Sequence, residues 1–320
     1  MLFSIIIPVY NRPLEIKELL ESLVSQTYKN FEIIIVEDGS LFTCEDMLGE
    51  FKSVLDLSYF FVENMGQGLA RNYGMNLAKG DYFVLFDSDC IIPPKYLEVL
   101  FRALISRNLD AHGGPDAADQ NFSPFQKAIN YSMTSFLTTG GIRGKLKDPA
   151  KYQARGYNMG LSKLAFNKSG GFLDPNRAED IELSMRLKKM GFRLELIEEA
   201  FVYHKRKNTW KSFFRQSFSF GENRVNVSRF HPDAVKLIHL MPSVFLGGWL
   251  LTLCSYFVMK PLFYLGGAVY ALWLFLVFLG STMQNKSVWV GILSVFTSFS
   301  QLSLYGVGMI SEGMKKLLRG

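Results

Sequence analysis

The sequence predicts an α/β domain with a mostly parallel, doubly wound sheet, followed by an α-helical transmembrane region. In the first part of the chain, short apolar runs bounded by turn residues alternate with stretches of helical periodicity, as in βαβ units. From Leu237 to Ile310 charged residues almost vanish, Lys260 and Lys286 being the clear exceptions. We therefore expect one domain in residues 1–230 and a membrane region in residues 237–320.

Four strands and two helices are expected in order along the first part of the domain. The strands are predicted at Phe3–Val9, Phe31–Val36, Tyr59–Val62 and Tyr82–Phe86. One helix opens at Pro13, and a second passes through Ala70, Tyr73 and Leu77. The first strand is a continuous apolar run, which is typical of a parallel strand buried on both faces. Ligands of such sheets bind beyond the carboxyl ends of the strands, so polar residues there are the candidates for function.

Three apolar stretches form the predicted membrane region: Leu237–Val258, Leu262–Leu279 and Val288–Ile310. A run of about 20 apolar residues is enough to cross a bilayer as a helix. The alternative is a buried helical core, but the length, adjacency and low charge of the three stretches favour a membrane.

A basic segment precedes these stretches, over about residues 203–236. Its bases are Lys205, Arg206, Lys207, Lys211, Arg215, Arg224, Arg229 and Lys236. Basic residues beside a membrane span indicate the cytoplasmic face and attract anionic lipid. Lys315, Lys316 and Arg319 give the same indication for the tail, yet three crossings would put the two ends on opposite sides. Val288–Ile310, the most polar stretch, is therefore the candidate for a segment that does not cross.

The compartment follows from three further observations. Leu2–Val9 is apolar but lacks the features of a secretory signal, so none is expected. The cysteines Cys44, Cys90 and Cys254 are odd in number and have no metal-binding spacing, which indicates a reducing compartment. Because the bases cluster beside the apolar stretches, they indicate membrane lipid and not nucleic acid. We expect the inner membrane, with the α/β domain in the cytoplasm.

The acidic sequence Asp87-Ser88-Asp89 directly follows the predicted strand Tyr82–Phe86. Two acids separated by one residue at a strand end can share a divalent ion and the diphosphate that the ion holds. Carboxylate oxygens suit Mg²⁺ or Mn²⁺. A solvated turn is the alternative, but the position directly after the apolar strand favours a metal site.

Two further polar groups follow other strands. Glu37 and Asp38 end the second strand and serve either a ligand or a local turn, with the two interpretations equally supported. Gly66 and Gly68 allow close approach of backbone to a ligand, and Arg71 either reaches phosphates or is a surface helix residue. The spacing is not that of a dinucleotide-binding motif, and the chain has no P-loop.

Glu179 and Asp180 open a predicted amphipathic helix after a Gly-Gly-Phe turn. Acids in a first turn interact favourably with the helix dipole, but such a pair also suits a general base at the edge of a cleft. His204 ends a short apolar strand and is equally consistent with a structural role and with a metal ligand.

Taken in order, these motifs resemble the inverting glycosyltransferase family 2, whose nucleotide-sugar domain has the GT-A fold. The matching motifs are Ile5–Asn11, Val36–Ser40, Ala70–Gly74, Asp87–Asp89 and Glu179–Asp180, and the resemblance covers roughly residues 1–225. Glu37 is a mild departure, because the family often has Asp at that position.

The resemblance implies a role for each matching residue on the donor side. Pro8 and Tyr10 would line the base pocket, Asp38 would bond the base, and Arg71 would contact the nucleotide or its diphosphate. Asp87 would meet the ribose or the water shell of the metal.

The resemblance also implies the catalytic and acceptor groups. Asp89 would bind Mn²⁺ or Mg²⁺ directly, His204 would be a further ligand, and Asp180, beside Glu179, would be the general base. The acceptor side would include Asn158, Met159, Gly160, Arg215 and Gln216. The Gln-x-x-Arg-Trp pattern of processive members is missing around Arg215, which argues against processive synthesis.

The expected function is inverting, metal-dependent transfer of a sugar from a nucleotide-sugar, by default UDP-linked, to a membrane-associated acceptor. A lipid-linked or membrane-proximal glycan would be the acceptor, in cell-surface glycan or glycolipid synthesis, with membrane lipids as further partners. The alternative is an inactive nucleotide-sugar-binding scaffold or sensor. A nucleotidyltransferase would need a Gly-rich basic loop after the first strand, and a transporter would need charged residues within the apolar helices.

Overall fold

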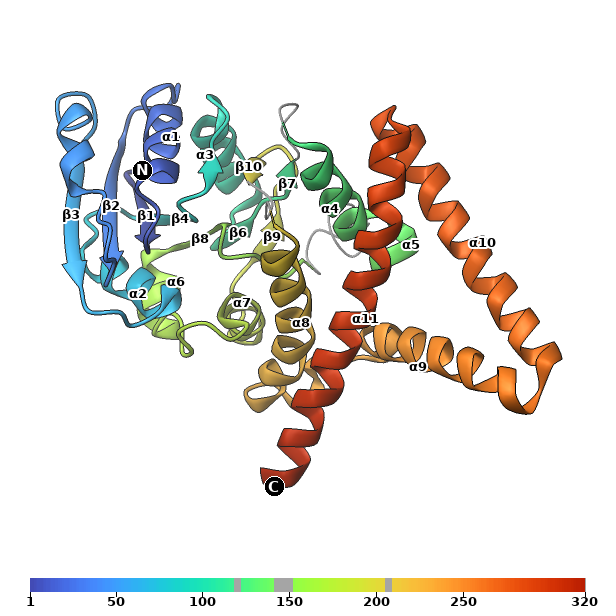
Figure 1. Cartoon of the computed structure of the whole chain (residues 1–320). Coiled ribbons are helices and arrows are strands. Elements are labelled where there is room, and N and C mark those ends of the chain that lie inside the picture. The colour runs from blue at the N-terminus through green and yellow to red at the C-terminus, as the bar shows by residue number, and fades with distance from the viewer. Residues whose placement is uncertain (118–121, 141–151, 205–208, 320) are drawn as a thin grey trace. The chain divides into compact units, whose positions relative to one another are not determined.

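The computed structural model describes residues 1–117, 122–140, 152–204 and 209–319. The chain divides into two compact units, which are described separately below (Figure 1). The first consists of Met1–Asp119 and Leu146–Lys205, and the second of Gln120–Lys145 and Arg206–Gly320. The second unit thus includes the predicted basic segment from Arg206 onward and a stretch from the middle of the chain. The domain boundary near residue 230 stays a prediction.

A seven-stranded sheet in the order β3-β2-β1-β4-β8-β6-β9 forms the centre of the first unit. Its strands are β1 (Phe3–Val9), β2 (Phe31–Asp38), β3 (Leu57–Val62), β4 (Tyr82–Phe86), β6 (Ala111–Gly113), β8 (Asn158–Ser162) and β9 (Leu194–Leu196). The first four are parallel, whereas β8 runs antiparallel to both of its neighbours. The predicted mostly parallel sheet is therefore confirmed, and so are the first four predicted strands, to within a few residues.

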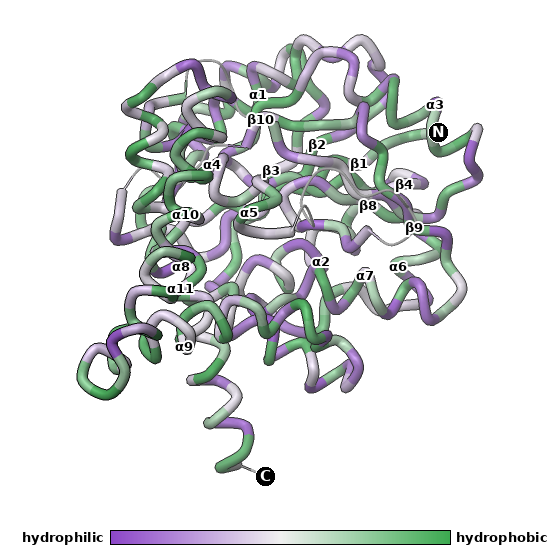
Figure 2. The backbone as a smooth tube through the Cα atoms, turned by 90° about the vertical axis from the view of Figure 1, so that its right-hand side faces the viewer, coloured by the Kyte–Doolittle hydropathy of each residue, from purple (hydrophilic) through white to green (hydrophobic). Residues whose placement is uncertain are grey.

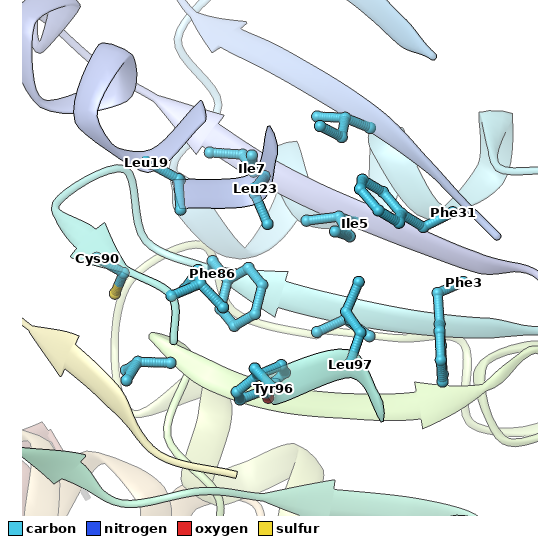
Figure 3. Packing of buried hydrophobic residues seen from close by; sticks show 14 of the residues in the cluster. Phe3, Ile5, Ile7, Leu19, Leu23, Phe31, Phe86, Cys90, Tyr96 and Leu97 are labelled. Atoms are coloured by element: carbon cyan, nitrogen blue, oxygen red, sulfur yellow. The ribbon is translucent and has the colours of Figure 1, made fainter. Parts of the chain in front are cut away.

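Helices cover both faces of this sheet. They are α1 (Pro13–Val24), α2 (Gln67–Leu77), α3 (Tyr96–Arg107), α6 (Lys163–Ser169) and α7 (Glu179–Lys189), with the short 3₁₀ helix η1 (Glu45–Glu50). On one face, Leu19 and Leu23 of α1 pack against Ile5 and Ile7 of β1 and lie close to Phe86 (Figure 3). The opposite face packs against α2, α6 and α7. Because both faces are buried, the central strands are apolar at nearly every position.

A second, three-stranded sheet lies in the same unit, with β10 (Val202–His204) between β5 (Cys90–Ile91) and β7 (Asp116–Ala117). Strands β10 and β5 are antiparallel, and His204 is paired with Cys90. This pairing brings His204 next to Asp89, the residue that immediately precedes β5.

The second unit is helical. It contains α4 (Pro124–Thr134), α5 (Phe136–Thr139), α8 (Trp210–Asn226), η3 (Val227–Arg229), η4 (Pro232–Ala234), α9 (Leu237–Val258), α10 (Lys260–Asn285) and α11 (Val288–Arg319). Of these, α9, α10 and α11 are long and apolar enough to cross a membrane, and α10 and α11 are coloured mostly as hydrophobic in Figure 2. The bounds of α9 agree with the prediction, whereas α10 and α11 extend several residues further than expected.

Candidate active site

The carboxyl ends of the neighbouring strands β2, β1 and β4 lie at one edge of the sheet, and the loops that follow them are tied together. Asn11, after β1, has a positive φ of 54°. Its side-chain oxygen accepts hydrogen bonds from the backbone N–H of Leu41, at 2.8 Å, and of Phe42, at 3.1 Å. Tyr10 is 54% exposed beside this contact, and Pro8 is half-buried in β1. Tyr10 is thus available to a ligand at this edge.

The acids that end β2 are both buried, and both accept hydrogen bonds from backbone groups. Glu37 accepts a hydrogen bond from the Ser40 hydroxyl and one from the backbone N–H of Cys44, at 2.9 Å. Asp38 accepts hydrogen bonds from the backbone N–H of Met65, at 2.7 Å, and of Gly66, at 3.0 Å. Glu37 therefore has the local-turn role, whereas Asp38 ties the end of β2 to the loop before α2, and contact of Asp38 with a base stays a prediction.

Asp89 and His204 form the strongest candidate metal site. Nε2 of His204 lies 3.0 Å from Oδ1 of Asp89, but that oxygen accepts no well-directed hydrogen bond within the described part of the chain. Adjacent ligands of an octahedral ion with bonds of about 2.1 Å are about 3 Å apart, so the spacing fits a shared Mn²⁺ or Mg²⁺. Burial alone would raise the pKa of Asp89, yet His204 and Arg12 hold it below its usual value, so Asp89 is ionised as a ligand must be. Although burial lowers the pKa of His204, Asp89 raises it above its usual value, so the imidazole has to give up a proton when an ion binds.

The surroundings of this pair distinguish a hard ion from a soft one. Cys90 offers its sulfur to the same group of atoms. Burial, with the nearby charges of Asp89 and Asp87, raises the pKa of the Cys90 thiol well above its usual value. The thiol donates to the backbone oxygen of Tyr157, at 3.5 Å. A protonated thiol is no ligand for Mn²⁺ or Mg²⁺, which leaves the carboxylate and the imidazole.

Arg71 is buried between two acids and is not a surface residue. Its side chain is 1% exposed, with Nη2 2.5 Å from Oδ1 of Asp87 and Nη1 3.5 Å from Oε1 of Glu179. The guanidinium also lies over the ring of Phe172, 5.5 Å from its centroid. A Cβ on Gly156 would lie 2.7 Å from both Nη atoms, so only glycine permits this packing. Arg71 therefore joins the end of β4 to the start of α7, and contact with the nucleotide stays a prediction.

The paired acids Glu179 and Asp180 have different environments, although both lie in the first turn of α7. Glu179 is buried and accepts a hydrogen bond from Nε2 of Gln67, at 2.6 Å; burial, together with Asp180, raises its pKa to about 7. Asp180 is half-buried, and its Oδ2 accepts a hydrogen bond from the backbone N–H of Gly156, at 3.1 Å. Asp180 is thus the acid of the pair that a substrate can reach.

The residues expected on the acceptor side do not come together at one surface of the first unit. Asn158, Met159 and Gly160 form part of β8 and are buried. The Asn158 side chain accepts a hydrogen bond from the Tyr96 hydroxyl, at 2.6 Å, and donates one to the backbone oxygen of Ala200, at 2.9 Å. The acceptor-side role of these residues stays a prediction. Arg215 and Gln216 lie in α8, in the second unit.

Three residues near the site were not singled out in the sequence. Arg12 forms an ion pair with Asp89, the ring of Tyr157 stacks on that of His204 with centroids 4.7 Å apart, and Gln67 holds Glu179. Arg12 follows the carboxyl end of β1, where ligands of such sheets bind, so it could have been chosen as a candidate from the sequence. Tyr157 and Gln67 carry no such signal, because their contacts depend on pairing between distant segments.

A mostly parallel sheet with acids at the ends of its strands, flanked by a small sheet that supplies a histidine, is the architecture of a GT-A nucleotide-sugar domain. The family assignment follows from a direct match: the model of glycosyl transferase family 2 matches residues 4–170. The chain belongs to this family.

Curated relatives match in parts. Glycosyltransferase GlyA of Streptococcus pneumoniae is 38% identical over 109 residues, which is 33% of this chain and 16% of GlyA. Chondroitin synthase of Escherichia coli is 26% identical over 234 residues, which is 63% of this chain and 34% of the synthase. The matched segments span less than half of the length of these relatives.

Solved structures share the fold over nearly the whole chain. The mannosyltransferase PcManGT from Pyrobaculum calidifontis, in complex with GDP-Man and Mn²⁺, has a TM-score of 0.68 at 17% identity, over 92% of this chain and 86% of that one. Residues 1–349 of S. aureus TarS, in complex with UDP-GlcNAc, have a TM-score of 0.51 at 17% identity, over 98% and 92% of the two chains. At this identity the likeness concerns the fold alone.

Proposed function

We propose that this protein transfers a sugar from a nucleotide-sugar to a membrane-associated acceptor, with inversion at the anomeric carbon and with Mn²⁺ or Mg²⁺. The observation that carries the proposal is the approach of His204 to Asp89, 3.0 Å apart, at the end of β4, where Asp87 also lies and is joined through Arg71 to Glu179, next to Asp180. Family membership supports it, as do structural neighbours bound to GDP-Man with Mn²⁺ and to UDP-GlcNAc. We propose a UDP-linked donor, with GDP as the alternative.

Asp89 and His204 would hold the ion, and Asp87 would contact the ribose or the water shell of the metal. When bound, a divalent ion stabilises the negative charge that develops on the departing diphosphate. Arg71 fixes the carboxylate of Asp87 from the protein side, at 2.5 Å. Pro8, Tyr10 and Asp38 would form the base pocket.

Asp180 would act as the general base. The acceptor hydroxyl oxygen bonds to the anomeric carbon as the bond from that carbon to the phosphate oxygen breaks, and Asp180 takes the hydroxyl proton. Attack from the face opposite the leaving group inverts the configuration. Asp180 lies in the first turn of α7, and the N–H of Gly156 donates a hydrogen bond to Oδ2 of its carboxylate. Buried Glu179 anchors this turn by its bond with Gln67.

Membrane attachment by the apolar helices of the second unit would bring the site to its acceptor. A lipid-linked or membrane-proximal glycan is the proposed acceptor class, since the helices α9 and α10 expose apolar side chains over most of their length. The bases that precede α9 support placement on the cytoplasmic face of the inner membrane. Asn158–Gly160, Arg215 and Gln216 remain the proposed acceptor-side residues.

The test is release of nucleoside diphosphate by the full chain in detergent, from UDP-, GDP- and TDP-sugars with Mn²⁺ or Mg²⁺. Membrane lipid extract supplies the acceptor, and Asp89→Ala and Asp180→Asn proteins are assayed in parallel. Metal-dependent release from one donor that both variants lose is the expected result. If no donor is bound or cleaved, the protein is a scaffold or sensor and not a transferase.

A further inference from the structure

The three long apolar helices of the second unit differ in how much of each is covered by protein. In the most apolar window of α9 and of α10, 6% of the residues are buried, whereas in that of α11 the share is 44%. In Figure 1, α9 begins beside α11 and α10 ends beside the N-terminal end of α11. The turn that joins α9 to α10 lies away from α11. Most of the surface of α9 and α10 is therefore not covered by protein and can contact another apolar phase, such as the interior of a bilayer.

Helix α11 packs against α4 in its first half and against α8 in its second half. In its first half, the Thr297 hydroxyl donates to the backbone oxygen of Ala128 in α4, at 3.2 Å. In its second half it packs closely on α8, because Gly221 and Gly308 leave no room for a side chain: a Cβ on Gly221 would overlap the backbone oxygen of Tyr305. Small residues at such a contact let two helix backbones approach each other.

The helices that cover α11 carry charge. Lys127 lies in α4, and Lys211, Arg215 and Glu222 lie in α8. If α11 crossed the hydrocarbon core, α4 and α8 would have to enter it as well, with these charged side chains. Charged groups within a bilayer are costly and rare. The packing therefore keeps α11 out of the hydrocarbon core.

Contacts at the end of α11 fix its side of the membrane. Nζ of Lys315 lies 3.2 Å from Oε1 of Glu222 in α8, and Nζ of Lys316 donates to the Ser228 hydroxyl in η3, at 2.8 Å. From η3 the chain passes through η4 into α9. The end of α11 and the start of α9 are thus neighbours on one side of the bilayer, and an odd number of crossings between them is excluded.

Helices α9 and α10 are suited to cross together. With 22 and 26 residues they are about 33 and 39 Å long, enough for a hydrocarbon core of about 30 Å. They contact each other from the turn as far as Phe245 and Trp273, whose ring centroids lie 4.9 Å apart, and the Tyr270 hydroxyl donates to the backbone oxygen of Phe245, at 2.6 Å. Four aromatic side chains gather around the turn at Met259 and Lys260: Tyr256, Phe257, Phe263 and Tyr264. Aromatic side chains with a nearby base are typical of a membrane–water interface.

We propose that α9 and α10 cross the bilayer as a hairpin with the Lys260 turn on the far side, and that α11 does not cross. The second unit then meets lipid in two ways, through the hairpin and through the outward apolar stripe of α11, which includes Phe296, Ile310 and Met314 and lies along the membrane surface. The proposal rests on the proposed membrane attachment, but it does not depend on the transferase activity.

Single cysteines test this in the full chain. Cys254→Ser removes the exposed native cysteine, while Cys44 and Cys90 are buried. Into this background we would introduce Lys260→Cys at the turn, or Leu317→Cys at the end of α11, where the native residue is 84% exposed. Ile105→Cys, at a position 61% exposed on α3, marks the side of the first unit. A membrane-impermeant maleimide is then added to sealed right-side-out and inverted vesicles.

The expected result is that Lys260→Cys reacts in vesicles of one orientation, and Leu317→Cys and Ile105→Cys only in the other. Reaction of Leu317→Cys on the same side as Lys260→Cys would mean three crossings and overturn the proposal. Reaction of Lys260→Cys on the side of Ile105→Cys, or on neither side, would overturn the crossing hairpin. Sedimentation of the protein with the vesicles tests attachment separately, and nucleoside diphosphate release in the same vesicles tests the activity.

Discussion

Replacing Arg71 by methionine removes the buried cation between Asp87 and Glu179 while keeping much of the side-chain volume. Removing one partner of a buried ion pair typically costs about 3–5 kcal/mol, because the other charge stays buried without compensation. For a unit of this size, such a loss lowers the melting temperature by about 10 °C. Because Arg71 holds both Asp87 and the start of α7, kcat/KM for the donor should also fall.

The loss of stability should depend on pH through Glu179. Its folded pKa of about 7 lies above the ordinary value of 4.5. The proton is therefore held more tightly in the folded state, and its stabilising effect is complete below pH 4.5 and lost as the pH rises through 7. Arg71 lowers this pKa, so its removal raises the value further, and the variant is least stable at the alkaline end of the range, where Glu179 is ionised. The difference from wild type should shrink at about pH 6, where Glu179 takes up a proton.

The assay is thermal unfolding of the full chain in detergent between pH 6 and 8.5, beside Arg102→Met as the matched control. Arg102 makes the same kind of contact, with Glu98, but its side chain is 76% exposed. Surface pairs at this helical spacing contribute about 0.5 kcal/mol or less. If Arg71→Met were as stable as Arg102→Met over this pH range, Arg71 would not be a buried bridge between the two acids.

Three further substitutions test other parts of the structure. Asp180→Asn should lower kcat about 10²–10⁴-fold and leave donor affinity unchanged in calorimetry, whereas an active variant would exclude Asp180 as the base. Gly156→Ala places a Cβ 2.7 Å from the buried guanidinium and should lower kcat in the diphosphate-release assay; wild-type kinetics would contradict that packing. Gly221→Ala should lower the melting temperature, because its Cβ would overlap the backbone oxygen of Tyr305. The control is Gly247→Ala, whose Cβ would have no atom within 4 Å and which should leave the melting temperature unchanged. Equal melting temperatures of the two variants would refute the close packing of α8 and α11.

The sequence predicted the part of the fold in which local pattern and burial agree. Strands β1, β2 and β4 are buried on both faces, which makes them continuous apolar runs that are easy to recognise. The acids at the ends of β2 and β4 could be found for the same reason. Strands β5 and β10 have two and three residues, too few for a pattern. The approach of His204 to Asp89 depends on their pairing and could not be predicted without the resemblance.

Two differences between expectation and structure come from burial that the sequence does not reveal. A charged residue on a helix next to glycines is expected at a surface or at a ligand, but Arg71 is buried because Asp87 and Glu179 compensate its charge. The resemblance named Asn158, Met159 and Gly160 for the acceptor side, and the structure has them in the buried strand β8. Close packing explains the glycine there, because a Cβ on Gly160 would meet the backbone oxygen of Phe83 at 2.5 Å.

Calorimetric titration of a nucleotide-sugar into the wild-type, Asp89→Ala and Asp180→Asn proteins, with and without Mn²⁺, tests the central claim most directly. If Asp89 and His204 hold the ion that binds the donor diphosphate, wild type and Asp180→Asn bind only with Mn²⁺, and Asp89→Ala does not bind. Equal binding by Asp89→Ala, or binding by wild type that is independent of the metal, would contradict a donor site built on Asp89.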